Sequence, residues 1–93
     1  PNSFALRGNY PNPFNPSTKI AYSIDINSKV NVKIYSLLGE EITSLFSGDV
    51  NPGTHEVQWN GVDNAGVAVA SGVYIYRVEA NNQALTGKMM LLK

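Results

Sequence analysis

Hydrophobic and polar residues alternate along most of this chain, which is the pattern of β-strands that bury one face and expose the other. The alternation is clearest over residues 18–26, 29–36, 54–60 and 73–80, and helical periodicity is nearly absent. The side chains expected to face the core from these strands are Ile20, Tyr22, Ile24, Ile26, Val30, Val32, Ile34, His55, Val57, Trp59, Tyr74, Tyr76 and Val78. Because one face of each strand is apolar and the other polar, the pattern predicts antiparallel sheet.

Three further segments bring the count to about seven strands. A short strand is expected around residues 4–8, another over 40–48 and a last one over 85–93. The spacing within 40–48 also permits a helical turn, but its β-branched and aromatic residues favour a bulged strand. Residues 27–29 suit a short hairpin turn between the strands on either side. About seven short strands with frequent turns predict an all-β fold, an immunoglobulin-like antiparallel β-sandwich.

A tyrosine supports the immunoglobulin-like arrangement. In "SGVYIY", Tyr74 follows a glycine turn at the start of a late strand, which is the place of the tyrosine corner. Tyr76 then takes the position of the second cysteine of antibody domains, but the chain has no cysteine. An antibody-type domain, a disulfide framework, a thiol nucleophile and a structural zinc finger are therefore not expected.

Length and charge narrow the functional classes. The 93 residues are expected to form one domain, 1–93, and the absence of an initiator Met suggests a module of a longer protein. The seven Lys and Arg residues balance the seven Asp and Glu residues without forming a basic cluster, so nucleic-acid binding is not expected. No apolar stretch reaches roughly 18 residues, so direct membrane insertion is not expected either.

The titratable residues do not form a catalytic set. The one histidine, His55, lies on the same predicted face as Val57 and Trp59, where a core or core-edge role explains it. Glu40 and Glu41 are adjacent, so on a strand they point to opposite faces and cannot act as a carboxylate pair. No serine stands in a nucleophile elbow. We expect neither enzymatic activity nor a cofactor.

One loop offers a weak metal candidate. Asp63 and Asn64 carry oxygen atoms that calcium accepts as ligands, and Gly66 closes the loop. Ordinary turn chemistry favours the same residue types, and the ligand series of an EF-hand is absent. A plain turn is therefore the preferred interpretation, with calcium binding as the alternative.

The segment "NYPNPFNPST", residues 9–18, combines three prolines with two aromatic rings. Because proline fixes φ and lacks an amide N–H, the prolines predict an extended segment that cannot join a sheet ladder. Tyr10 and Phe14 are expected to fold back over one end of the sandwich. The alternative is that these two rings contact a partner.

The final strand is apolar on both faces. Met89, Met90, Leu91 and Leu92 are consecutive, and successive side chains of a strand point in opposite directions. One pair can enter the core. The other pair is either covered within the domain or left open for a partner, which could bind by adding a strand to the sheet edge.

Five motifs taken together resemble the type A C-terminal sorting domain of type IX secretion, found at the end of many exported proteins of Bacteroidetes and related bacteria. They are NYPNPFNP, IYSLLG, PGTHEVQW, SGVYIYR and the terminal Lys93, and the resemblance spans Phe4 to Lys93. The Ig-like domain of the flagellar hook-capping protein is similar over the part between Trp59 and Tyr76. Two positions depart from the usual sorting-domain pattern, Ser36 for Asp and Glu40 for Arg, so no charged contact is assigned there.

The resemblance implies a non-catalytic C-terminal secretion signal. Domains of this kind carry a fused N-terminal cargo through the periplasm to an outer-membrane translocon of a Gram-negative bacterium. A surface peptidase typically removes them and joins the cargo, now at the cell surface, to an anionic lipopolysaccharide. The residues that the resemblance ties to partner recognition are Gly72, Tyr74, Arg77, Gly87, Lys88, Met89, Met90, Leu91, Leu92 and Lys93.

Two other functions remain open. Many secreted β-sandwiches bind carbohydrate on an aromatic platform, for which Tyr10, Phe14 and Tyr35 are the candidates. The chain could also be a structural Ig-like spacer. Most of the other aromatic residues stand at inward-facing positions of the alternating pattern, which favours a role in the core.

Overall fold

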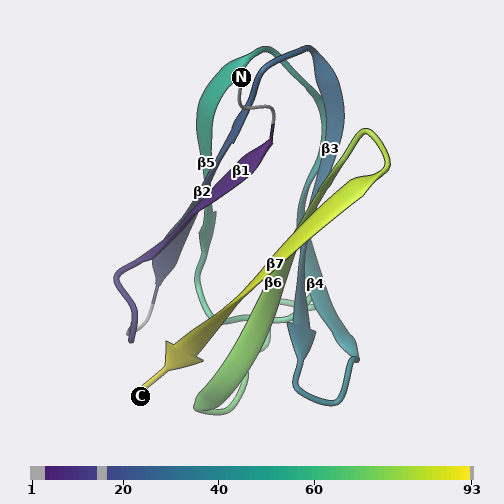
Figure 1. Ribbon diagram of the computed structural model, residues 1–93. Helices are drawn as coiled ribbons and strands as arrows, with labels where there is room; N and C mark the ends of the chain where they lie inside the picture. Colours follow the sequence, from purple (N-terminus) through teal and green to yellow (C-terminus); the bar gives the residue numbers. More distant parts are fainter. Residues whose placement is uncertain (1–3, 15–16, 93) are drawn as a thin grey trace.

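The computed structural model describes residues 4–14 and 17–92, which form seven strands in two antiparallel sheets that lie face to face (Figure 1). The strands are β1 (Ala5–Tyr10), β2 (Thr18–Ile24), β3 (Ser28–Ser36), β4 (Glu41–Val50), β5 (Gly53–Trp59), β6 (Gly72–Ala80) and β7 (Gln83–Leu91). The order is β1-β2-β5 in one sheet and β4-β3-β6-β7 in the other. The described part of the chain contains no helix suited to cross a membrane. The all-β, immunoglobulin-like sandwich is confirmed.

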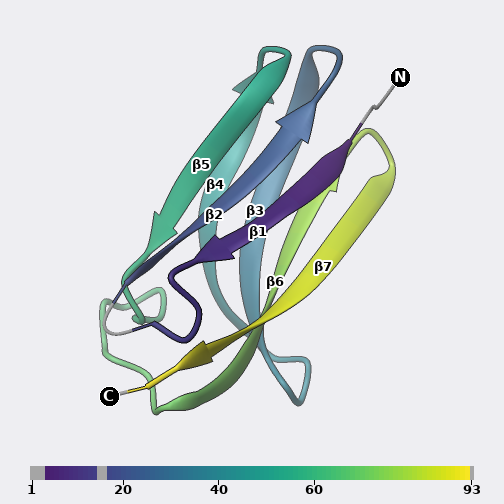
Figure 2. The ribbon, with the colours of Figure 1, turned by 60° about the vertical axis from the view of Figure 1, so that its left-hand side comes forward.

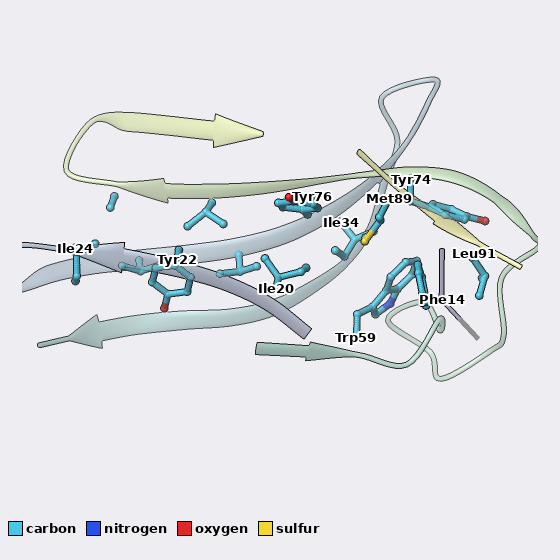
Figure 3. Close-up of a cluster of buried hydrophobic side chains, with 14 residues drawn as sticks. Phe14, Ile20, Tyr22, Ile24, Ile34, Trp59, Tyr74, Tyr76, Met89 and Leu91 are labelled. Atoms are coloured by element: carbon cyan, nitrogen blue, oxygen red, sulfur yellow. The ribbon is translucent and has the colours of Figure 1, made fainter. Parts of the chain in front are cut away.

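The core fills the space between the two sheets (Figure 3). Its buried apolar residues are Phe14, Ile20, Tyr22, Ile24, Val30, Val32, Ile34, Trp59, Tyr74, Tyr76, Val78, Ala80, Met89 and Leu91. Period-2 alternation therefore identified the inward face correctly on β2, β3 and β6. His55 and Val57 are only half-buried, because β5 is an edge strand whose side chains have a strand on one side only.

The hairpin predicted at residues 27–29 is wrong. β2 pairs with β1 and β5, whereas β3 pairs with β4 and β6, so residues 25–27 carry the chain from one sheet to the other. Ile26 lies in this crossing with 57% of its surface exposed and is not a core residue. The alternation continues past Ile24, the last paired residue of β2, so the pattern alone overestimates the strand.

The strand predicted over residues 40–48 is confirmed as β4, which begins at Glu41, and its irregular spacing has a structural cause. The register between β3 and β4 shifts twice, which leaves Leu45 and Ile42 as extra residues on β4. Each bulge turns the side chains that follow it to the other face, so apolar residues no longer recur at every second position. The strand predicted around residues 4–8 is also confirmed as β1, which continues to Tyr10.

Three aromatic rings fill the end of the sandwich at which β7 finishes (Figure 3). The Trp59 ring centroid lies 5.6 Å from that of Phe14 and 5.2 Å from that of Tyr74, the latter in an edge-to-face arrangement. The Trp59 indole N–H donates to the Val62 carbonyl oxygen at 2.8 Å. The Tyr74 hydroxyl donates to the Ala70 carbonyl oxygen at 2.7 Å, which is the bond that defines a tyrosine corner.

Replacing Trp59 by Ala should lower the free energy of unfolding by about 3–5 kcal/mol, because it removes a fully buried ring from two aromatic contacts. Tyr10→Ala is the matched control, since 81% of the Tyr10 surface is exposed, and it should change stability by less than about 1 kcal/mol. Urea unfolding followed by circular dichroism measures both. Equal losses in the two variants would contradict this account of the core.

Candidate recognition site at the C-terminal strand

The loop after β1 lies along the outer edge of β7 and pairs with its last residues (Figure 2). The Phe14 N–H donates to the Met90 carbonyl oxygen at 2.9 Å, and the Leu92 N–H donates to the Phe14 carbonyl oxygen at 2.9 Å. These bonds make a single parallel bridge between Phe14 and Leu91. We call the contact of residues 10–14 with Lys88–Leu92 the loop–strand clamp.

Asn12 completes the clamp with its side chain. Its Oδ1 accepts a hydrogen bond from the Met90 N–H at 3.0 Å, and its Nδ2 makes a longer contact of 3.5 Å with the Lys88 carbonyl oxygen. The side-chain amide thus stands in for the peptide group of a neighbouring strand. Sequence reasoning missed this residue. The available signal was its position between two prolines, which lack a backbone N–H, so that the side-chain amide adds both a donor and an acceptor to a segment poor in donors.

The two aromatic rings of this segment differ in burial. Phe14 folds back into the core as expected, with 2% of its surface exposed. Tyr10 points to solvent with 81% exposure, so the expectation that it caps the sandwich is wrong. The prediction that this segment stays out of the sheet ladder also fails at Phe14, because that residue keeps its N–H for the bridge to β7.

The side chains of β7 divide between the core and the surface. Met89 and Leu91 are each 1% exposed, whereas Met90 is 39% and Leu92 48% exposed, and Lys88 is exposed as well. The expected entry of one apolar pair into the core is confirmed, and of the two alternatives for the other pair the described residues show the open one. A shallow hollow of about 360 Å³ lies beside the open pair, lined by Asn12, Pro13, Val73, Lys88, Met89 and Met90.

Two glycines of the predicted recognition set have structural roles. Gly72 has a φ of +153°, a conformation that side chains other than hydrogen rarely adopt. Gly87 pairs with Tyr76 across β6 and β7, and the Tyr76 ring occupies the place that a Cβ of residue 87 would take. Both glycines therefore serve the fold of the strands that carry the site.

The tyrosines behind the site are buried in the core. Burial raises the pKa of Tyr74 and that of Tyr76, because an ionised phenolate would lose its hydration there. Burial raises the pKa of Tyr22 in the same way. These hydroxyls stay protonated at neutral pH, so Tyr74 remains the donor to Ala70 and is not available to a partner.

Arg77 lies on the outer face of β6 with its Nε 2.8 Å from Glu79 Oε2, as an ion pair whose geometry is too bent for a good hydrogen bond. Both side chains are partly exposed, so the pair contributes at most about 1 kcal/mol to stability. Arg77 pairs with Thr86, and Lys88 lies two residues further along β7, so Arg77 and Lys88 are on the same outward face of the sheet. Lys93 lies outside the described residues, as does the third proline of the loop, Pro16.

The oxygens proposed for calcium already have structural bonds. Asp63 Oδ1 accepts from the N–H groups of Ala65 and Val67, and Asn64 Oδ1 accepts from the Thr43 hydroxyl at 2.9 Å. These bonds close the loop and tie it to β4, which favours the plain turn. Within residues 4–14 and 17–92, no group of three acidic or histidine side chains could hold a metal.

Asn12→Ala should weaken the clamp, because the Met90 N–H loses its acceptor, with a cost of about 0.5–1.5 kcal/mol. The Met90 amide should exchange its hydrogen faster, while the amides of β6 stay protected. Asn12→Asp is the matched control, since it keeps an acceptor oxygen for the Met90 N–H. Unchanged exchange at Met90 in Asn12→Ala would show that the side chain does not hold the strand.

Comparisons with known proteins agree with this fold. The FlgD Ig-like domain family matches residues 15–84. Among solved structures, dimeric latent PorU from Porphyromonas gingivalis is similar over 99% of this chain, with 22% identity and a TM-score of 0.81. PorZ, an essential surface component of the type IX secretion system of the same bacterium, is similar over 95%, with 23% identity and a TM-score of 0.65.

The chain spans 9% of the PorU chain and 11% of the PorZ chain, so it corresponds to one small part of each. No curated protein matches the chain. The expected relation to the Ig-like domain of the hook-capping protein is confirmed by the family match, and the two solved structures share the fold of this chain. Since the family match covers most of the sequence, the chain belongs to the FlgD Ig-like domain family.

Proposed function

We propose that this chain is a non-catalytic C-terminal secretion signal, which addresses a fused cargo to the type IX outer-membrane translocon and the cell surface. The observation that carries the proposal is the pair of exposed apolar side chains at the end of the described chain, Met90 in β7 and Leu92 just after it. Apolar side chains exposed on a terminal strand favour association, so their presence fits a segment that a partner binds.

The clamp supports a role in recognition because it fixes these side chains in space. Hydrogen bonds hold the backbone of Lys88–Leu92 on its outer edge, and β6 pairs with it on the other. Met90 and Leu92 therefore stand on a backbone that is ordered before binding, which lowers the entropic cost of association. The loop also occupies the outer backbone edge of Met90 and Leu92, so a partner would contact their side chains and not their backbone.

The comparisons with known proteins also support the proposed role in type IX secretion. PorZ is a surface component of the type IX secretion system, and the structural similarity to PorU covers nearly the whole chain, β7 included. The match to the FlgD Ig-like family ends at residue 84, before the clamped part of β7. A type IX role places this module in an exported or surface-exposed protein of a Gram-negative bacterium, with the translocon and the surface peptidase as its partners.

The proposed role requires no catalysis by the module itself. The one histidine, His55, has its Nε2 2.7 Å from the Asn51 carbonyl oxygen and its ring 5.7 Å from that of Tyr22. Glu41 pairs with Lys33 at 3.7 Å on the outer face of the four-stranded sheet. Both contacts are structural, and neither brings an acid, a base and a nucleophile together.

The proposal is tested by fusing residues 1–93 to a periplasmic reporter in a type IX-competent host and measuring surface display with and without the module. Met90→Thr combined with Leu92→Thr should reduce display at least tenfold while the melting temperature changes little, because both side chains are exposed. Leu38→Thr combined with Val67→Thr makes the same chemical change on two exposed loop residues and should leave display unchanged.

Equal display with and without the module would reject the sorting role. Point variants are preferable to deletion of Lys88–Lys93, because deletion also removes the buried Met89 and Leu91 and the partners of Phe14. A truncated chain would lose core packing of about 2–5 kcal/mol per large residue, so its failure to be exported would say nothing about recognition.

A carbohydrate-binding module is the second candidate, and the exposure of Tyr10 favours it. This ring stands at a shallow hollow of about 270 Å³, together with Lys19 and Gln58. Phe14 and Tyr35 are buried and half-buried, so Tyr10 is the ring with the most exposed face among the three proposed for sugar binding. Retention on insoluble polysaccharide that Tyr10→Ala abolishes would establish this function, and no retention would remove it.

A further inference from the structure

The outer edge of β7 has two halves with different hydrogen-bonding states. The second half, Lys88–Leu92, is covered by the loop–strand clamp. The first half, Gln83–Gly87, pairs with β6 on one side and with no described strand on the other. β7 is therefore an edge strand over only part of its length.

The direction of each peptide group on β7 follows from two independent observations. Met90 uses both its N–H and its carbonyl oxygen toward the loop, so every second residue from Met90 points its backbone groups outward. At the other end, Asn81 and Asn82, both with positive φ, form a two-residue turn that Ala80 and Gln83 close. The pair that closes such a turn is hydrogen-bonded, so Gln83 and every second residue after it bond to β6. The even-numbered residues between them therefore point their backbone groups outward, as Met90 does.

It follows that Ala84 and Thr86 each present an N–H and a carbonyl oxygen to the outside, and Lys88 presents an N–H. Among the residues that the structure describes, no backbone or side-chain group is bonded to these five backbone groups. Odd-numbered residues such as Leu85 and Gly87 carry the bonds to β6. The open edge is thus a row of unpaired donors and acceptors with the spacing of a β-ladder.

The other edge strands carry features that discourage pairing, and this half of β7 carries none of them. β1 has a register shift between Leu6 and Gly8, and β4 has two shifts in its pairing with β3. β5 places the charged Glu56 at its centre. Residues 83–87 contain no charge, no proline and no bulge, and their register with β6 is regular. Bulges and charges are the usual means by which proteins keep edges from pairing.

We propose that the open half of β7, Gln83–Gly87, accepts an extended, uncharged segment of a partner protein as an added strand. The inference rests on the proposed function, so the partner is a component of the export machinery. Leu85 faces inward and is only half-buried, so an apolar side chain of the added strand would cover it. The loop blocks further pairing at Lys88, which fixes the register of the incoming segment.

The first test uses amide hydrogen exchange of the unmodified 93-residue chain. The amides of Ala84 and Thr86 should exchange at least tenfold faster than those of Leu85 and Gly87, which donate to β6. The Met90 amide should exchange its hydrogen slowly, because its N–H donates to Asn12 Oδ1 in the clamp. Equal protection along Ala84–Gly87 would mean that the edge is already paired and would overturn the proposal.

The second test compares Thr86→Pro with Thr86→Ala in the surface-display experiment. Both variants lose the threonine side chain, but only proline removes the outward N–H, and proline is tolerated in edge strands where the N–H faces solvent. Thr86→Ala should be displayed as the unmodified module is, whereas Thr86→Pro should be displayed at least tenfold less while retaining its melting transition. Ala84→Pro probes the neighbouring outward amide and replaces Thr86→Pro if that variant does not fold.

The outcomes separate the two proposals. Absence of display for the unmodified module rejects the sorting role, and the edge inference falls with it. Display of the unmodified module together with normal display of the folded proline variant rejects the edge inference alone. Sedimentation shows whether the chain forms a dimer that Thr86→Pro abolishes; such a dimer would mean that the edge binds a second copy and would overturn the partner named here.

Discussion

The contact between the Phe14 and Trp59 rings holds the loop–strand clamp in place. Phe14 comes from a loop with few hydrogen bonds of its own, and burial of its ring against the indole fixes where that loop lies. Once the ring is fixed, the Phe14 peptide groups stand opposite β7 and bind it. The position of the loop against the last strand therefore depends on an aromatic contact between residues 45 positions apart, since the clamp has no other buried side chain from the loop.

Sequence reasoning was most successful where the cause is local. Alternation of side chains along one strand reports which face is buried, so β2, β3 and β6 and their core residues were predicted correctly, except for Ile26 beyond the end of β2. The tyrosine corner was predictable because its hydrogen bond joins residues four positions apart, Tyr74 and Ala70. Which strands pair is not a local property. The chain crosses between sheets at residues 25–27, where the turn residues are equally suited to a hairpin, and the prediction failed there.

The candidate site shows the same division. The exposed apolar pair on β7 was predictable from four consecutive apolar residues, because one of two opposite faces had to remain outside a two-layer core. The clamp was not predictable, because Asn12 and Met90 are 78 positions apart in the sequence and no periodicity links them. The three prolines and two aromatic rings of this segment indicated an ordered loop but could not show that the loop occupies a sheet edge.

The elongated shape of the domain separates its two ends. The domain measures 38 × 22 × 20 Å, β1 begins at one end of the sandwich, and β7 finishes at the other (Figure 1). A cargo joined ahead of Ala5 would enter at the end farthest from Leu92. The bulk of such a cargo would then stand one domain length away from Met90 and Leu92. Under the proposed function, the same C-terminal surface could therefore be recognised on cargo proteins of very different size.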